Sequence, residues 1–149
     1  MKITTTSPAG IELIKSFEAF RSTPYLDSAN IPTTGYGTIR YPDGTKVKIT
    51  DKPITEEKAT EYMQHDLRQF ELAVDAMTVD TITQNQFDAL CSFAYNVGAA
   101  GLRGSTLLKR VNSGTGDIRA AFLMWNKADG RVVKGLTNRR NREADLYLS

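Results

Sequence analysis

Residues 55–77 carry a narrow apolar stripe that repeats at three- and four-residue steps, the spacing of one face of a helix. Thr55 is predicted to cap the start of this helix, because threonine side chains accept hydrogen bonds from the first backbone amides. A single helix of this length with so narrow a stripe predicts a strut that joins two lobes. The stripe consists of Ala59, Tyr62, Met63, Leu67, Phe70, Val74 and Met77.

In the segment before the long helix, the residue pattern changes from helically spaced apolar residues to short stretches separated by turn-forming residues. Ser7 and Pro8 are typical of a helix start, and apolar spacing continues to about Phe20. Residues 38–50 then predict a hairpin, with a turn at 42–44 and alternating residues behind it. We therefore expect a small, half-solvated antiparallel sheet in this part of the chain.

The segment after the long helix predicts further helices. Thr83 with Gln86 forms a capping-box pattern before a strongly apolar helix, which Gly98 can end in a left-handed conformation. Shorter helices are predicted from Ser105 and Asp117, and a final helix from residue 137 or 138. Residues 127–135 read as a turn-rich excursion of unassigned role.

These elements predict an α+β fold in a single domain of residues 1–149. A small α/β lobe with an antiparallel sheet would occupy roughly residues 20–55. A larger helical lobe would contain roughly residues 56–149 together with the N-terminal helix. The long helix would join the lobes, and a cleft between them would be lined by the end of the first helix and the start of the sheet.

The composition excludes several classes of protein. No apolar run approaches the length of a membrane span, and the first 15 residues lack the apolar core of a secretory signal. We therefore expect cytosolic accumulation unless another agent releases the chain. Cys91 is the only cysteine and His65 the only histidine, so we expect no metal cluster, no histidine-based triad and no cofactor. Cys91 is expected to be a small buried hydrophobe, and His65 to face solvent.

The charge is unevenly distributed along the chain. Residues 1–100 carry 9 basic and 13 acidic side chains, whereas residues 101–149 carry 10 basic and 4 acidic ones. A basic C-terminal half suggests an anionic polymer as a partner, although a solvated face is the default explanation. A nucleic-acid binder is disfavoured, because Arg139, Arg140 and Arg142 lack interleaved aromatic residues.

The stretch FEAFRSTPYLDSANIPTTGYG, residues 17–37, contains the candidate chemistry. Glu18 shares the helix face of Ile11 and Ile14 and lies in the last turn, where partial burial and the helix dipole are both expected to raise the pKa of its carboxyl group. A protonated glutamic acid is what a general acid requires. The alternative is that Glu18 pairs with a basic residue and only holds the lobes together.

Asp27 and Thr33 follow Glu18 across a short connection. Turn aspartates usually bond their own backbone, and a threonine at a strand start is common. Two carboxyl groups in different environments are nevertheless the parts needed to cleave a glycosidic bond. The Thr33 hydroxyl can hold a water for attack.

The spacing Glu18…Asp27…Thr33-Thr34-Gly35-Tyr36-Gly37 resembles the catalytic signature of phage-type lysozymes, glycoside hydrolase family 24. FAYNVGAAGLRGSTLL (93–108) is similar to the central helix and cleft-lining turn of that family. Trp125 with GLTNRR (135–140) is similar to its C-terminal segment. The resemblance spans nearly the whole chain, and it is strongest to endolysins of tailed phages that infect Gram-negative bacteria.

The resemblance implies the lysozyme-like form of the fold predicted above, and hydrolysis of the β-1,4 bond between N-acetylmuramic acid and N-acetylglucosamine in peptidoglycan. It implies inversion, for which the two carboxyl groups lie roughly 6.5–9.5 Å apart. Glu18 would be the general acid, Asp27 the base, and Asp27 with Thr33 would position the attacking water. Arg139 matches an arginine that pairs with the catalytic glutamate.

The resemblance also indicates sugar-contacting positions, at which this chain has side chains that differ from those of the family. Ile39, Tyr95 and Thr106 fall at sugar-contacting positions of the family. Thr38 replaces a histidine of the best-known member, so that member's pairing in the small lobe is expected to be absent.

The resemblance also implies partners and location. The partners would be peptidoglycan glycan strands and, through the basic C-terminal region, the anionic cell envelope; no nucleic acid is expected. A monomer without signal peptide or signal anchor would stay in the host cytoplasm until a holin releases it to the periplasm. A lytic transglycosylase or a non-catalytic peptidoglycan-binding protein on the same fold are the alternatives. The presence of Asp27 and Thr33 argues against the first, and the presence of all three site residues against the second.

Overall fold

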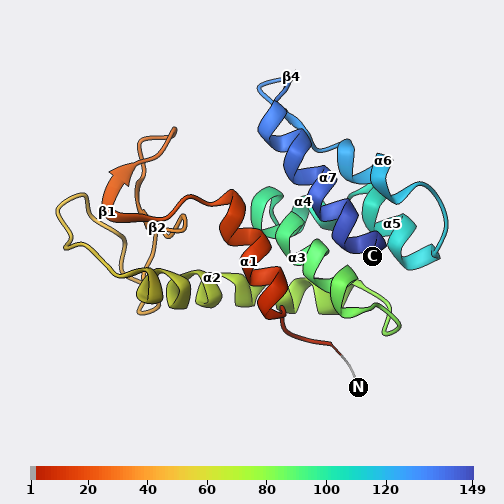
Figure 1. Cartoon of the computed structure of the whole chain (residues 1–149), viewed down its shortest axis with the longest axis horizontal. Helices are drawn as coiled ribbons and strands as arrows, with labels where there is room; N and C mark the ends of the chain where they lie inside the picture. Colours follow the sequence, from red (N-terminus) through yellow and green to blue (C-terminus); the bar gives the residue numbers. More distant parts are fainter. Residues whose placement is uncertain (1–2) are drawn as a thin grey trace. The chain divides into compact units, whose positions relative to one another are not determined.

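The computed structural model describes residues 3–149, which form helices and two small antiparallel sheets (Figure 1). In chain order the elements are α1 (Pro8–Phe17), β1 (Arg21–Leu26), β2 (Pro32–Gly35), α2 (Glu56–Met77), α3 (Gln84–Val97), α4 (Ala99–Arg103), α5 (Thr106–Ser113), α6 (Ile118–Leu123), β3 (Lys127–Ala128), β4 (Arg131–Val132) and α7 (Lys134–Leu148). No described helix is long and apolar enough to cross a membrane.

The chain divides into two compact units. The sheet unit comprises Glu12–Gln69, and the helical unit comprises the described residues up to Ile11 together with Phe70–Ser149. The division falls inside α1 and inside α2, whereas the sequence suggested a small lobe of roughly residues 20–55. The last residues of α1 and the first part of α2 therefore belong to the sheet unit.

The two predicted N-terminal helix starts are confirmed. The Ser7 hydroxyl accepts a hydrogen bond from the Gly10 amide at 3.3 Å, and the Thr55 hydroxyl accepts one from the Lys58 amide at 3.1 Å. The first helix ends at Phe17 rather than near Phe20, because the chain turns into β1 from Arg21. Along α2 the buried stripe contains Ala59, Met63, Leu67 and Val74.

The sheet of the sheet unit is the β1–β2 hairpin, not the segment 38–50. β1 and β2 run antiparallel, with Tyr25 opposite Thr33 and Leu26 opposite Pro32. The predicted hairpin at 38–50 keeps its turn but is reduced to a single bridge between Arg40 and Lys46. Its second arm leaves the ladder because the Lys48 amide donates to the Asp51 carboxylate at 2.9 Å.

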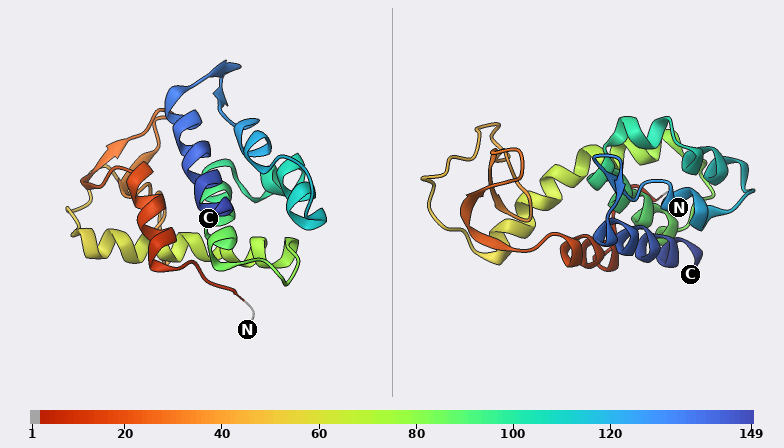
Figure 2. Two further views of the ribbon diagram at one scale, coloured as in Figure 1. Left: turned by 45° about the vertical axis from the view of Figure 1, so that its right-hand side comes forward. Right: turned by 90° about the horizontal axis from the view of Figure 1, so that it is seen from above.

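The core of the helical unit is α3, as its nearly all-round apolar sequence predicts. The capping box of Thr83 and Gln86 is present, and residues 87–94 are buried. Gly98 ends the helix with the expected positive φ of 93°, although its ψ of 153° lies outside the left-handed helical region. α7 packs along α3, and α6 packs against α7 (Figure 2).

Aromatic rings fill the space next to α3. The Phe93 ring contacts the rings of Phe122 and Trp125 edge to face, at centroid distances of 5.7 and 5.6 Å. Cys91 is buried as expected, and burial raises the pKa of its thiol, which keeps it protonated and unreactive. His65 is exposed, as predicted.

The C-terminal elements confirm two predicted helix starts and correct a third. The Ser105 side chain caps α5 and the Asp117 side chain caps α6. The 127–135 excursion forms the β3–β4 hairpin, which turns at Asp129 and Gly130. The last helix begins at Lys134 instead of residue 137 or 138, because it continues directly from the hairpin.

Candidate active site

Glu18 follows the last residue of α1 and is half-buried, and its amide still donates to the Ile14 carbonyl at 3.1 Å. The end of α1 is attached to the sheet unit by a polar clamp. Lys15 lies 3.6 Å from the Glu56 carboxylate and over the Tyr36 ring, and the Tyr36 hydroxyl donates to Glu56 at 3.0 Å. Burial and this bond raise the pKa of Tyr36 to about 12, so the hydroxyl stays a donor. The clamp fixes the backbone that presents Glu18.

The Glu18 carboxylate faces Gly37. A Cβ at Gly37 would lie 3.7 Å from Oε2 of Glu18, and the backbone at Gly37 has a φ of 92°. Glycine adopts this conformation at little cost, whereas other residues are strained there. A side chain at position 37 would therefore contact the Glu18 carboxylate directly.

Asp27 lies at the end of β1, at the start of the tight β1–β2 connection. Its Oδ1 accepts hydrogen bonds from the amides of Ala29 at 2.8 Å and Ile31 at 2.9 Å. Its own amide donates to the Ile31 carbonyl at 3.1 Å. Oδ2 makes no hydrogen bond with any described residue, so one carboxylate oxygen is held while the other stays available.

Thr33 is fixed to the same peptide segment as Asp27. It is 3% exposed, and its hydroxyl donates to the Ile31 carbonyl at 2.8 Å. Because the hydroxyl proton is used in this bond, the oxygen is left as an acceptor. A water near both side chains could donate one hydrogen to Thr33 and the other to Asp27, which leaves its lone pair for attack.

Glu18, Asp27 and Thr33 all lie in the sheet unit. No pattern in the sequence pointed to Ile31, whose backbone hydrogen-bonds with Asp27 and Thr33, or to the clamp of Lys15, Tyr36 and Glu56. Ile31 acts through its main chain, so its side-chain type carries no signal. The clamp could have been suspected from a lysine in the last turn of α1, but its partners are distant in sequence.

Thr38 stands where the best-known member of the resembled family has a histidine. It is fully buried, and its hydroxyl donates to Oδ2 of Asp66 in a long hydrogen bond of 3.5 Å. Burial raises the pKa of Asp66, while the nearby His65 and this hydrogen bond oppose the rise. A neutral hydroxyl thus contacts the Asp66 carboxylate in this part of the sheet unit.

The three predicted sugar-contacting residues lie in both units. Ile39 is 46% exposed and lines a pocket of about 390 Å³ with Ile31 and Arg40 in the sheet unit. Tyr95 is half-buried on α3 against the Phe70 ring, and Thr106 is the first residue of α5 in the helical unit. Their contacts with sugars stay a prediction.

Arg139 belongs to a buried polar cluster of the helical unit. Its Nε lies 3.2 Å from Oε2 of Glu143, and its guanidinium donates to the Ser92 carbonyl at 3.0 Å. Arg140 Nε lies 2.7 Å from Oε1 of the same Glu143, and both of these side chains are fully buried. Arg139 and Glu18 belong to different units, so their expected pairing stays a prediction.

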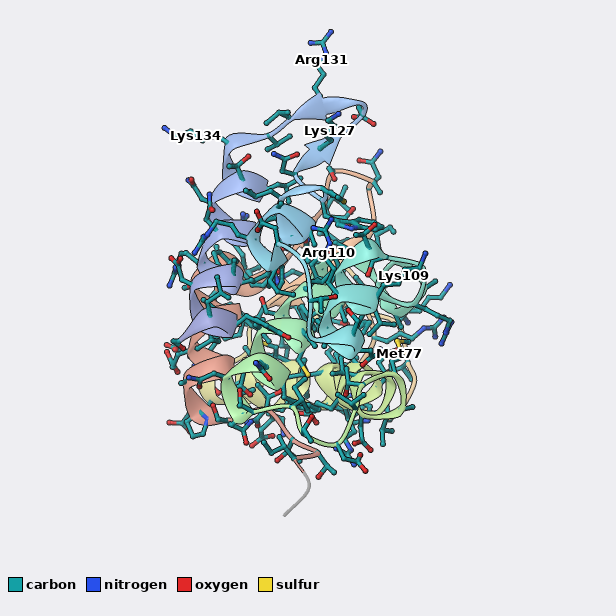
Figure 3. All side chains as sticks on the ribbon, turned by 90° about the vertical axis from the view of Figure 1, so that its right-hand side faces the viewer. Met77, Lys109, Arg110, Lys127, Arg131 and Lys134 are labelled. Atoms are coloured by element: carbon teal, nitrogen blue, oxygen red, sulfur yellow. The ribbon has the colours of Figure 1, made fainter. Side chains whose placement is uncertain are left out.

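The burial of Arg140 corrects the expected basic surface. Arg139 is 4% and Arg140 0% exposed, so neither can contact an envelope, and both are structural partners of Glu143. Arg142, in contrast, is exposed, and three further exposed cations lie on and beside the β3–β4 hairpin. Arg131 projects from the hairpin, with Lys127 and Lys134 on either side of its base (Figure 3).

The chain is similar to several phage proteins. The family model described as phage lysozyme matches residues 15–143. An endolysin of Bacillus phage B103 is 44% identical over 144 residues, which are 96% of this chain and 54% of that protein. This chain therefore spans about half the length of that relative. The endolysin of Salmonella phage P22 is 40% identical, with 96% of this chain and 97% of the relative covered.

A solved structure is similar over the whole chain. The endolysin from Escherichia coli O157:H7 phage FAHEc1 has a TM-score of 0.91 at 41% identity, and covers 100% of this chain and 97% of its own. The predicted lysozyme-like α+β fold is thereby confirmed. The relatives come from phages of Bacillus as well as Salmonella, so the similarity is not restricted to phages of Gram-negative hosts. The matched span contains Glu18, Asp27 and Thr33, and this chain belongs to the phage lysozyme family.

Proposed function

We propose that this chain is an endolysin, a muramidase that hydrolyses the β-1,4 bond between N-acetylmuramic acid and N-acetylglucosamine for lysis of a phage host. The observation that carries the proposal is the shared attachment of Asp27 and Thr33 to Ile31. It leaves one carboxylate oxygen and one hydroxyl oxygen as acceptors. A water that donates one proton to each of these oxygens keeps a lone pair for the reacting carbon.

Glu18 supplies the second function, protonation of the leaving oxygen. It is half-buried, and its carboxylate faces the backbone of Gly37. Asp27 takes a proton from the water as the water attacks the opposite face of the sugar, which inverts the anomeric carbon. Arg139 is proposed to support Glu18, as in the family, and Ile39, Tyr95 and Thr106 are proposed to contact the sugars.

The experiment that tests this mechanism replaces Glu18 by glutamine. Glu18→Gln should reduce clearing of outer-membrane-permeabilised cells by roughly a thousandfold, because the side chain can no longer donate a proton to the leaving group. Glu57→Gln is the matched control, since Glu57 is an exposed carboxylate of the same unit that takes no part in the clamp. Full clearing by Glu18→Gln would overturn the assignment.

The released saccharides decide between hydrolysis and the competing chemistry. Inversion predicts a newly formed α-anomer by proton NMR at early times. A 1,6-anhydro product would identify a lytic transglycosylase, in which the sugar's own hydroxyl attacks. A retained anomer would make a carboxylate the nucleophile, and binding to peptidoglycan with no released saccharide would identify a non-catalytic binding protein.

We further propose that the β3–β4 hairpin contacts the anionic envelope. Lys127, Arg131 and Lys134 are exposed there, and the neighbouring Val132 is 62% and Val133 38% exposed. Cations beside exposed apolar side chains favour the surface of an anionic lipid layer.

Vesicle binding tests this surface. Changing Lys127, Arg131 and Lys134 to glutamine should weaken binding to vesicles that contain phosphatidylglycerol. The change should have little effect on cleavage of a short soluble oligosaccharide. The control makes the same change of charge at Lys48, Arg103 and Lys109, which are also exposed. Equal loss of binding in both variants would show that only net charge matters.

Release through a holin and action as a monomer are proposed from the family resemblance. Expression in bacteria with and without a holin should give lysis only in the first case. Sedimentation analysis of the purified chain should give the mass of one chain. Lysis without a holin would contradict the first proposal, and a dimer mass the second.

A further inference from the structure

A second pocket lies in the sheet unit, in the loop before α2 and the first turns of that helix. It has a volume of about 540 Å³ and is lined by Tyr41, Asp43, Asp51, Lys52 and Tyr62, together with Pro42, Pro53, Ile54 and Lys58. None of the proposed catalytic residues lines it.

Two aromatic rings provide the apolar wall of this pocket. Tyr41 and Tyr62 meet at a centroid distance of 5.4 Å and an interplanar angle of 66°. The Tyr41 hydroxyl donates to Oδ2 of Asp51 at 2.6 Å, which fixes its ring. The Tyr62 hydroxyl makes no hydrogen bond with any residue in the described range 3–149. The Tyr41 ring is therefore anchored, while the Tyr62 ring has the Lys58 ammonium group 5.7 Å from its centroid and keeps its hydroxyl without a partner among the described residues.

The polar wall contains both acceptors and donors. Oδ1 of Asp43 is used by the amide and hydroxyl of Thr45, at 2.9 and 2.7 Å, which leaves Oδ2 without a partner among the described residues. Oδ1 of Asp51 is likewise left over, since Oδ2 takes the bonds from Tyr41 and Lys48. The exposed Lys52 has no ion pair within residues 3–149.

This combination selects a class of ligand. The lining holds two carboxylates and two ammonium groups, of which that of Lys58 also pairs with Glu61 at 3.2 Å, so attraction and repulsion largely cancel for a ligand with a net charge. A neutral ligand rich in hydroxyl groups can donate to the carboxylates and accept from the ammonium groups. A pyranose ring also has an apolar C–H face that can lie against an aromatic side chain. A sugar combines these properties.

We propose that this pocket is a second, non-catalytic sugar site that holds another part of the glycan strand. The choice of glycan rests on the proposed function, whereas the existence of the site rests on the pocket. A second binding site for the same strand raises the effective concentration of the strand at the catalytic residues. It would therefore affect binding to polymeric peptidoglycan more than cleavage of a short oligomer.

The first experiment is an amide NMR titration of the Glu18→Gln protein with peptide-free oligosaccharides of N-acetylglucosamine and N-acetylmuramic acid. Amides of residues 41–54 and 58–62 should shift as one group, and the amide of Gly37 as a separate group. The double variant Asp43→Asn with Tyr62→Leu should lower the affinity measured from the first group of amides at least fivefold. The affinity measured from the Gly37 amide should stay unchanged. Glu57→Gln is the control, an exposed carboxylate of α2 outside the pocket.

A milder variant tests whether the effect comes from loss of the fold. Asp43→Asn with Tyr62→Phe keeps the oxygen that accepts from Thr45 and keeps the aromatic ring, so its NMR spectrum should stay native. The oligosaccharide affinity measured from the amides of residues 41–54 and 58–62 should still fall. In the wild-type protein, the pocket variants should lose binding to insoluble peptidoglycan and keep kcat on a short oligomer.

The outcomes separate this proposal from the proposed function. Shifts at Gly37 with none at residues 41–54 would overturn the second site and leave the hydrolase intact. Shifts that the pocket variants do not weaken would overturn it as well. Pocket shifts in a protein whose wild type releases no saccharide would support the sugar site and contradict the hydrolase.

Discussion

The carboxylate of Glu18 lies 3.7 Å from the place where a Cβ of Gly37 would stand. Gly37→Ala would put a methyl group against this carboxylate and force a φ of 92° on a residue with a side chain. We expect a loss of stability of about 1–2 kcal/mol from the backbone strain. We expect a fall in kcat/KM of roughly tenfold to a hundredfold from obstruction of Glu18.

Gly44→Ala is the matched control for that prediction. Gly44 has a φ of 90°, and a Cβ there would meet no atom within 4 Å. It should lose similar stability by thermal unfolding and keep its activity. Equal activity of the two variants would show that Gly37 serves only the backbone.

Replacement of Asp27 should separate its chemical role from its structural one. Asparagine keeps the oxygen that accepts from Ala29 and Ile31, so Asp27→Asn should leave the unfolding temperature nearly unchanged. The same variant should lose roughly a hundredfold to ten-thousandfold in kcat, since an amide cannot take a proton from the water.

Asp27→Ala should be equally inactive but less stable, because it removes both hydrogen bonds, each worth about 0.5–1.5 kcal/mol. Chemical denaturation of the two variants measures this difference. An active Asp27→Asn protein would contradict the assignment of Asp27 as the base.

Removal of Glu143 should be strongly destabilising. It is fully buried between the guanidinium groups of Arg139 and Arg140, and its loss leaves buried cations without a counter-charge. Glu143→Gln should cost about 3–5 kcal/mol in the free energy of unfolding. Asp145 lies on the same helix as Glu143, and Asp145→Asn, which breaks the exposed ion pair of Asp145 with Arg119 on α6, should cost about 0–1 kcal/mol.

A double-mutant cycle checks the coupling. Arg140→Met combined with Glu143→Gln should cost less than the sum of the single changes, because one uncompensated cation is removed with the carboxylate. Additive losses would show that the two side chains stabilise the helical unit independently.

Asp66 should make stability fall as the pH rises. Burial raises its pKa in the folded state above the ordinary 3.8, so the unfolded chain gives up the proton first. Below an ordinary carboxyl pKa the group is protonated in both states and costs nothing. The loss of stability grows as the pH rises from the ordinary pKa to the raised pKa of the folded state, and it is constant above that.

Asp66→Asn removes this cost while keeping an acceptor for the Thr38 hydroxyl. The variant should gain stability over the wild type near about pH 7 and show no gain near about pH 3. Urea unfolding at both pH values measures it. An equal gain at both would point to packing instead of charge.

Helix starts and the candidate catalytic set were predictable because both depend on short intervals of sequence. The caps by Ser7, Thr55, Thr83, Ser105 and Asp117 are hydrogen bonds that span three residues. The spacing of Glu18, Asp27 and Thr33 likewise follows from one helix end and one hairpin.

The hairpin at 38–50 and the start of α7 were predicted less well. Alternation suggested a ladder behind the turn at 42–44, but the Asp51 carboxylate takes the Lys48 amide away from it. The last helix begins at Lys134 without a capping side chain, because Val133 follows directly from the β3–β4 hairpin and donates to the Asn126 carbonyl.

The sequence by itself determined the family, the α+β class and the three candidate catalytic side chains, since spacing and periodicity are written along the chain. The tertiary structure decided which cations are on the surface. Arg140 is buried because Glu143 neutralises it and the Phe93 ring covers it, and Phe93 lies on another helix. Burial depends on which segments pack together, so two adjacent arginines gave no sign of it. The same holds for Ile31, whose backbone joins Asp27 to Thr33 only when the hairpin closes.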